Sequence, residues 1–281
     1  MLIGIYRMRV LILGSEGTVG RSVSNLFIEK GHDVIRWDIK LGEQYDLRKE
    51  GCLDSILPSI DFVIFLAFDV GGAKYDVNSF RYLDDNLLLI HNTFTSLKKY
   101  NKPFIHSTST MSNMNHNSYA VLKRLAELYT LLLDGVNIKL WNVYGNEEIG
   151  LKSHVLPDFI SQALLSNSIH IRSSGLEERM FLHCDDFSNA LYTVFQNYSI
   201  IDRSSVIDVS SYEWISIKSI AYTIQKVMKE SYGKDITISS NGDFQDSHNK
   251  RNEPDLTIIS KFWKQSISIE NGIRDMIKKS L

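Results

Sequence analysis

The sequence predicts an α/β fold, in which a doubly wound parallel sheet is followed by a smaller C-terminal α/β domain. Over the first two-thirds of the chain, short apolar and β-branched runs alternate with longer stretches of helical periodicity. The run at residues 62–68 is apolar without interruption, as expected for a strand that is covered on both faces. Strands and helices that alternate through short connections are typical of parallel sheets with right-handed crossovers.

The expected elements follow one another in a regular order. The strands are expected at residues 9–13, 34–37, 62–68, 104–106 and 136–141, and the helices between them at 23–30, 83–100 and 118–133. After Gly145 the pattern weakens, and we expect helices at 157–165, 217–230 and 269–279 and strands at 169–171 and 205–209. This order predicts two domains. A sheet domain comprises residues 1–145 and about 187–212, and a substrate domain comprises about 146–186 and 213–281.

Composition and charge exclude several classes of function. Of the 281 residues 43% are hydrophobic, which is enough for a full core. The 31 basic and 33 acidic side chains give a net charge of −2, which argues against a cationic nucleic-acid binder. The longest apolar run is far shorter than the roughly twenty residues of a membrane span. Cys52 and Cys184 form no Cys-x-x-Cys motif. We therefore expect a cytoplasmic enzyme without a metal, a nucleic-acid partner or a membrane anchor.

A glycine-rich turn follows the first expected strand and opens the first helix. Residues 14–20 read Gly-Ser-Glu-Gly-Thr-Val-Gly. Glycine is needed in such a turn because the bend is tight and the backbone must approach a pyrophosphate. The N-terminus of the helix then offers free N–H groups to the phosphates. We expect a Rossmann-type dinucleotide site, with contacts from Gly14, Glu16, Gly17, Thr18 and Val19.

An aspartate at the end of the second expected strand indicates which dinucleotide binds. Asp38 stands eighteen residues beyond Gly20 and can accept hydrogen bonds from both ribose hydroxyls of the adenosine, while it would repel a 2′-phosphate. No arginine follows it directly. This favours NAD over NADP. Asp46 and Leu47 are expected at the edge of the adenine.

A tyrosine and a lysine lie four residues apart on the helix expected at 118–133. Tyr119 and Lys123 therefore share one helix face. The ammonium is expected to lower the pKa of the phenol, so that Tyr119 can exchange a proton with a carbinol near neutral pH. The lysine can also hold the nicotinamide ribose. Of the hydroxyls that close the preceding strand, we favour Thr108 as the substrate contact and keep Ser109 as the alternative.

Together, the glycine loop, the acidic strand end, the hydroxyl and the Tyr-x-x-x-Lys pair resemble the extended short-chain dehydrogenase/reductase superfamily of sugar-nucleotide enzymes. Four segments resemble GDP-L-fucose synthase and, more loosely, GDP-mannose 3,5-epimerase. They are the Val-Gly-Gly of Val70, Gly71 and Gly72, the Asn-Val-Tyr-Gly that starts at Asn142, the Ser-His-Val-Leu-Pro that contains His154, and the Arg-Met-Phe-Leu-His-Cys-Asp-Asp that starts at Arg179.

The resemblance implies roles for these residues. Val70, Gly71, Gly72 and Ser109 would contact the sugar, and Arg179 would contact the nucleotide diphosphate. His154 would be an acid/base or would bind the substrate. Asn142 and Val143 would flank the nicotinamide, and Asn142 would also touch the substrate. The cofactor set is completed by Leu66 and Ala67, in the strand expected at 62–68.

The departures from those enzymes bear on the reaction. Thr110 stands where fucose synthases have a cysteine acid/base, so epimerisation with two bases is in doubt. The glycine loop has Glu16 where they have an arginine, which agrees with NAD. Only eleven positions separate Thr108 from Tyr119, fewer than is usual in the family. The Asp-Glu pair of the 4,6-dehydratases is missing, which disfavours dehydration.

We interpret the chain as an NAD-dependent nucleotide-sugar epimerase that exchanges a hydride at a sugar carbon, most simply C4 of a nucleotide-diphosphate hexose such as a GDP-sugar. One alternative is a 4-keto nucleotide-sugar reductase of the fucose-synthase type. Another, from a different class, is a non-catalytic NAD-binding regulatory protein. The resemblance also implies a homodimer that forms through a four-helix contact.

Overall fold

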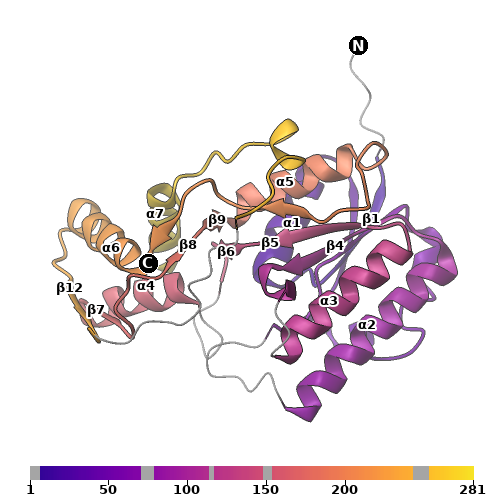
Figure 1. Ribbon diagram of the computed structural model, residues 1–281, viewed down its shortest axis with the longest axis horizontal. Coiled ribbons are helices and arrows are strands. Elements are labelled where there is room, and N and C mark those ends of the chain that lie inside the picture. The colour runs from indigo at the N-terminus through magenta and orange to yellow at the C-terminus, as the bar shows by residue number, and fades with distance from the viewer. Residues whose placement is uncertain (1–6, 71–78, 114–116, 148–153, 243–252) are drawn as a thin grey trace.

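The computed structural model describes residues 7–70, 79–113, 117–147, 154–242 and 253–281 (Figure 1). The predicted fold class is confirmed, because the larger part is a six-stranded, wholly parallel sheet with helices on both faces. The strand order is β2-β1-β3-β4-β5-β10. The strands are β1 (Arg9–Leu13), β2 (Asp33–Trp37), β3 (Phe62–Phe65), β4 (Phe104–Ser109), β5 (Val136–Leu140) and β10 (Ile207–Val209).

Each strand supplies both faces of the sheet with apolar side chains. In β1, Val10 and Ile12 face α1 (Thr18–Glu29) and α5 (Cys184–Gln196), whereas Leu11 and Leu13 face α2 (Phe80–Tyr100) and α3 (Ser118–Leu132). This alternation explains why the strands read as continuous apolar runs. The strand order changes direction between β1 and β3, and ligands of such sheets bind beside the carboxyl ends of the strands at that point.

The connection from β2 to β3 contains only three short 3-10 turns, namely η1 (Ile39–Leu41), η2 (Glu43–Tyr45) and η3 (Leu57–Ser59). Consequently β2 ends the sheet on that side. The strand expected at 62–68 already ends at Phe65. The helix expected at 83 begins at Phe80, because the Ser79 hydroxyl accepts a hydrogen bond from the Tyr82 N–H and caps it.

The smaller part lies beside the sheet, at the left of Figure 1. Its core is formed mainly by α4 (Val155–Ser166), α6 (Ile217–Tyr232) and α7 (Ile269–Ser280). Three strand pairs accompany them: β6 (Asn142–Tyr144) with β9 (Phe181–His183), β7 (Ser168–Ile171) with β12 (Thr237–Ser240), and β8 (Glu178–Arg179) with β11 (Ile215–Ser216). Among the described residues, no helix has the length and apolar character needed to cross a membrane.

One segment differs from the expected division of the chain. Ile259 and Trp263, which we assigned to the substrate domain, pack into the core between the sheet and α1 and α5. The chain returns to the sheet there, where the Asp255 N–H donates to the Asp208 carboxylate of β10 at 2.9 Å. The remaining boundaries, at about 146, 187 and 213, stay a proposal.

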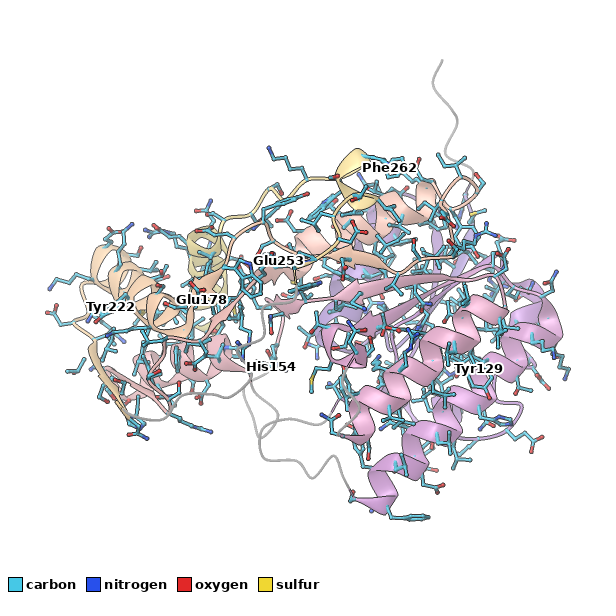
Figure 2. The ribbon with its side chains drawn as sticks, viewed as in Figure 1. Tyr129, His154, Glu178, Tyr222, Glu253 and Phe262 are labelled. Atoms are coloured by element: carbon cyan, nitrogen blue, oxygen red, sulfur yellow. The ribbon has the colours of Figure 1, made fainter. Side chains whose placement is uncertain are left out.

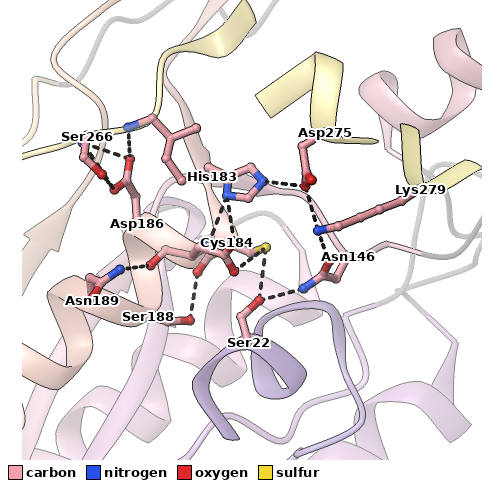
Figure 3. Close-up of polar contacts among 12 residues, drawn as sticks. Ser22, Asn146, His183, Cys184, Asp186, Ser188, Asn189, Ser266, Asp275 and Lys279 are labelled. Atoms are coloured by element: carbon pink, nitrogen blue, oxygen red, sulfur yellow. Dashed lines mark hydrogen bonds and ion pairs between the residues drawn. The ribbon is translucent and has the colours of Figure 1, made fainter. Parts of the chain in front are cut away.

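A buried carboxylate fastens the chain before α7 to α5. Asp186 is 1% exposed and accepts hydrogen bonds from the Ser266 hydroxyl at 2.6 Å and from the N–H groups of Ser266 and Ile267 at 3.1 and 2.7 Å (Figure 3). Three donors would lose their partner without it.

We predict that Asp186→Ala lowers the free energy of unfolding by about 3 kcal/mol, because buried donors to a charged acceptor would be left unpaired. Urea unfolding followed by circular dichroism measures the change. Asp185→Ala is the matched control, since the neighbouring side chain is half exposed. Equal midpoints for the two variants would contradict the assignment.

Candidate active site

The glycine loop packs tightly against the end of β3. Gly14 has a φ of +85°, and a Cβ on it would lie 2.6 Å from the Ala67 nitrogen. A Cβ on Gly20 would lie 2.0 Å from the Gly14 oxygen. Both positions therefore require glycine. Leu66 continues β3 through its N–H, which donates to the Leu13 oxygen at 2.9 Å.

The N-terminus of α1 fits a dinucleotide diphosphate. Gly17 is its N-cap residue, no side chain caps the helix, and the first turn, which contains Thr18 and Val19, holds no acidic residue. The N–H groups and the positive end of the helix dipole are thus available to an anion. The geometry fits the dinucleotide cofactor that the sequence predicts.

Two carboxylates stand where the adenosine ribose is expected. Asp38 accepts hydrogen bonds from the N–H groups of Glu16 and Lys40 at 3.0 and 2.9 Å. The Glu16 carboxylate pairs with Arg36 at 3.3 Å. Negative charge at this place suits the ribose hydroxyls of NAD and disfavours a 2′-phosphate.

Asp46 and Leu47 lie further along the same connection. Asp46 forms a bidentate pair with Arg48, at 2.9 and 2.8 Å, and Arg48 also pairs with Asp85 of α2 at 3.1 Å. The hydrogen bonds from Arg48 lower the pKa of Asp46. The Leu47 side chain is buried in the core. Their contact with adenine stays a prediction.

Tyr119, Lys123 and the end of β4 come together as the spacing predicts. The Ser109 side chain interacts with the Tyr119 phenol and acts to lower its pKa. The Lys123 ammonium is buried, donates to the Ser107 carbonyl oxygen at 3.1 Å and lies 4.1 Å from the centre of the Phe68 ring. These three contacts place a phenol, a hydroxyl and an ammonium at the carboxyl edge of the sheet.

The pKa of the Tyr119 phenol does not fall as expected. Burial raises the pKa of the Tyr119 phenol, and the hydrogen bond from Ser109 only partly offsets the rise. Burial also lowers the pKa of Lys123 to about 7. Lys123 is buried against the end of β4, where desolvation penalises its charged form.

The two neighbouring hydroxyls at the end of β4 have different partners. Thr108 is buried and donates to the Glu127 carboxylate at 2.6 Å, whereas the alternative, Ser109, meets Tyr119. Adjacent residues of a strand point to opposite faces, which is why the two hydroxyls differ in their partners. Which of them contacts the substrate stays a prediction. Glu127 itself was missed. It lies on α3 four residues after Lys123, and that spacing was the available signal.

The residues expected at the substrate end are more scattered. The Asn142 amide donates to the Met180 oxygen at 3.3 Å and joins β6 to β9. Val143 follows Asn142 in β6 and is half-buried. Arg179 of β8 donates to the Glu178 oxygen at 2.8 Å. Val70 is half exposed, and Gly71 and Gly72 lie outside the described residues.

His154 lies between the smaller part and the sheet (Figure 2). It is the N-cap residue of α4, its side chain is 64% exposed, and Nδ1 is hydrogen-bonded to the Glu147 carboxylate. This bond raises the pKa of His154. Among the described residues, no contact joins His154 to the Ser109–Tyr119 pair.

Comparison with known proteins agrees with this geometry. The model of the NAD dependent epimerase/dehydratase family matches residues 10–209. UDP-glucuronic acid decarboxylase 1 of Arabidopsis thaliana is 22% identical, over 98% of this chain and 70% of that protein.

Two solved structures share the fold. WbmF of Bordetella bronchiseptica, in complex with NAD+ and UDP, gives a TM-score of 0.80 at 20% identity, over 97% of this chain and 92% of that one. A GDP-6-OMe-4-keto-L-xylo-heptose reductase of C. jejuni gives a TM-score of 0.82 at 19% identity, over 98% and 97%.

The carboxylates beside the ribose site lead to a prediction about the cofactor. Asp38→Ala combined with Ile39→Arg should weaken NAD binding and admit NADP, because the repulsion of a 2′-phosphate is replaced by attraction. Titration of both cofactors against wild type and variant, followed by fluorescence, measures the change. A wild type that already prefers NADP would contradict the role of Asp38.

Proposed function

The chain belongs to the NAD dependent epimerase/dehydratase family, and we propose that this NAD-dependent enzyme inverts C4 of a nucleotide-diphosphate hexose. The Ser109–Tyr119 pair, with Lys123 buried behind it, carries the proposal. It offers one proton-transfer group and one hydrogen-bond donor on a rigid helix and strand end. That is sufficient for chemistry at a carbinol carbon.

The residues of the chain have separate duties in this proposal. NAD bound at the glycine loop supplies the hydride chemistry. Burial keeps the Tyr119 phenol protonated at rest, so that it can exchange its proton with the sugar oxygen. Ser109 holds a hydrogen bond to the same oxygen. Lys123 stabilises the phenolate form and holds the nicotinamide ribose.

We propose inversion at C4 alone because neither Thr110 nor His154 is suited to act as a second acid/base group. Inversion beside a ketone, at C3 or C5, needs a base on one face of the sugar and an acid on the other. The Thr110 hydroxyl does not ionise usefully at neutral pH. His154 is engaged by Glu147 and exposed, so we assign it to binding or orienting the sugar.

The proposed substrate is a nucleotide sugar such as a GDP-sugar. Arg179 is proposed to hold its diphosphate, because a planar guanidinium suits two phosphate oxygens. Asn142, with Val70, Gly71 and Gly72, is proposed to surround the sugar. The similarity to WbmF, which was solved with NAD+ and UDP, supports this substrate class.

A 4-keto nucleotide-sugar reductase is the second candidate. The segments around His154 and Arg179 resemble fucose synthases, and the fold is shared with a 4-keto-heptose reductase. Asp38 favours the epimerase, because a cell holds most of its NAD in the oxidised form that a closed redox cycle needs.

The chain is also proposed to form a homodimer. Leu83, Leu87 and Leu88 of α2 and Leu128 and Leu131 of α3 are more than a third exposed. The two helices pack side by side on one face of the sheet (Figure 1). Two copies could cover these apolar side chains in a four-helix contact.

We predict that Tyr119→Phe lowers turnover by about 10²- to 10⁴-fold, the usual effect of losing general acid–base catalysis. Ser109→Ala should cost about 10²-fold, as for the loss of one oriented donor. Thr108→Val, the control at the neighbouring hydroxyl, should cost less. Turnover of a panel of nucleotide hexoses is measured by NMR. A larger loss for Thr108→Val than for Ser109→Ala would overturn the assignment of the hydroxyl.

The site of inversion can be tested with deuterium. In D₂O we expect inversion at C4 with no deuterium at C3 or C5 of the recovered sugar. The reaction should need no added reduced cofactor. Deuterium at C3 or C5 that disappears in His154→Asn would show a second base, and consumption of one NADH or NADPH per product would show a reductase.

A further inference from the structure

Glu127 has the most enclosed carboxylate near the proposed catalytic set. Its side chain is 2% exposed, although an ionised carboxylate is costly to remove from water. Oε1 accepts from the Thr108 hydroxyl at 2.6 Å, and Oε2 accepts from Arg124 at 2.8 Å. The bond from Thr108 ties the middle of α3 to the end of β4, the strand that carries Ser109, whereas Arg124 lies on α3 itself.

The groups around Glu127 come from two further positions on the sheet. Lys139 of β5 places its ammonium 4.0 Å from Oε1. The Asn137 amide, also on β5, donates to the Glu127 carbonyl oxygen at 3.0 Å, and its Oδ1 lies 3.0 Å from His106 Nδ1. Burial lowers the pKa of His106 to about 3, so this ring is neutral. Glu127 is therefore the acidic side chain that faces Arg124 and Lys139 in this part of the described chain.

The Lys123 ammonium depends on the Glu127 carboxylate more than the Arg124 guanidinium does. Among the described residues no carboxylate lies within 4.0 Å of its ammonium, which is enclosed by the Ser107 carbonyl, the Phe68 ring and Tyr119. Arg124, by contrast, is 56% exposed and is stabilised by water. Burial lowers the pKa of Lys123, and the charge of Glu127 acts against this fall.

We propose that Glu127 is a positioning residue for the Ser109–Tyr119–Lys123 set. Through Thr108 it holds the end of β4 against α3, and its negative charge favours the ammonium form of the buried Lys123. The inference rests on the proposed function, because that function gives Lys123 its duties. An uncharged Lys123 could neither stabilise the phenolate of Tyr119 nor hold the ribose as a charged donor.

The arrangement predicts two effects of opposite sign. Glu127→Gln keeps the size of the side chain and an acceptor for Thr108, but removes the negative charge. The protonation constant of Lys123 should fall by about tenfold, as expected for a charge at medium range in a partly shielded site. Arg124→Gln removes a positive charge that partly cancels Glu127, so the same constant should rise, by severalfold. A purely structural role would not give opposite shifts.

The experiment is a pH titration of the full-length protein, without cofactor or substrate. The signal is the NMR shift of the lysine ε-carbon in ¹³C-labelled protein, and Lys123→Met identifies the resonance. Asp134→Asn is the control, since Asp134 lies just beyond α3 and is 78% exposed. It should leave Lys123 unchanged. In a second measurement, the pH above which NAD affinity declines should move down in Glu127→Gln and up in Arg124→Gln.

The outcomes separate this inference from the proposed function. Opposite shifts of Lys123 support the inference even if the chain proves to be a reductase. Unchanged or parallel shifts in folded variants overturn it, even if C4 inversion is found. Should Glu127→Gln fail to fold, Arg124→Gln decides alone, because its exposed side chain can be changed without opening the core. In that case, a protonation constant of Lys123 that does not rise overturns the inference.

Discussion

The contact between one face of α3 and the end of β4 is the constraint on which the chemistry of this chain depends. Tyr119, Lys123 and Glu127 follow one another at single-turn intervals, and each meets a different atom of the strand end. Side chains of a single helix thus contact the Ser109 hydroxyl, the Ser107 carbonyl and the Thr108 hydroxyl. These contacts require that each polar side chain of the helix stays opposite its own partner on the strand. An isolated polar group in this layer would be expensive, whereas a complete network is rigid.

At the cofactor end of the site, the geometry is set by the backbone rather than by side chains. The Gly14 turn lies against Ala67, and α1 begins without a side-chain cap, so the partial charge of the helix faces the position of the diphosphate. The carboxylates of Asp38 and Glu16 stand to one side of it. The two ends of the site therefore differ in kind. One is formed by backbone N–H groups at the start of a helix, and the other is a layer of interacting side chains.

Much of this could be predicted from the sequence, because it depends on local patterns. Apolar runs gave the strands, glycine at 14, 17 and 20 gave the turn, and the four-residue interval gave the Tyr119–Lys123 face. The sequence could not decide between Thr108 and Ser109, because the choice depends on which face of β4 each side chain occupies. The direction of the Tyr119 pKa also escaped prediction, because desolvation depends on how α3 and the sheet enclose the phenol. Ile259 and Trp263 were misplaced for a similar reason: apolar residues in a short, irregular stretch do not indicate which core they join.

The position of β2 at the margin of the sheet has a consequence for aggregation. This edge strand has five residues, and its sequence includes the charged Asp33 and Arg36. Charged side chains on a short edge discourage pairing with a strand of another molecule, which is a common route to aggregation. The opposite edge, β10, has only three residues, and the chain at Asp255 is hydrogen-bonded to it. Strand-to-strand association is therefore disfavoured at both margins of the sheet.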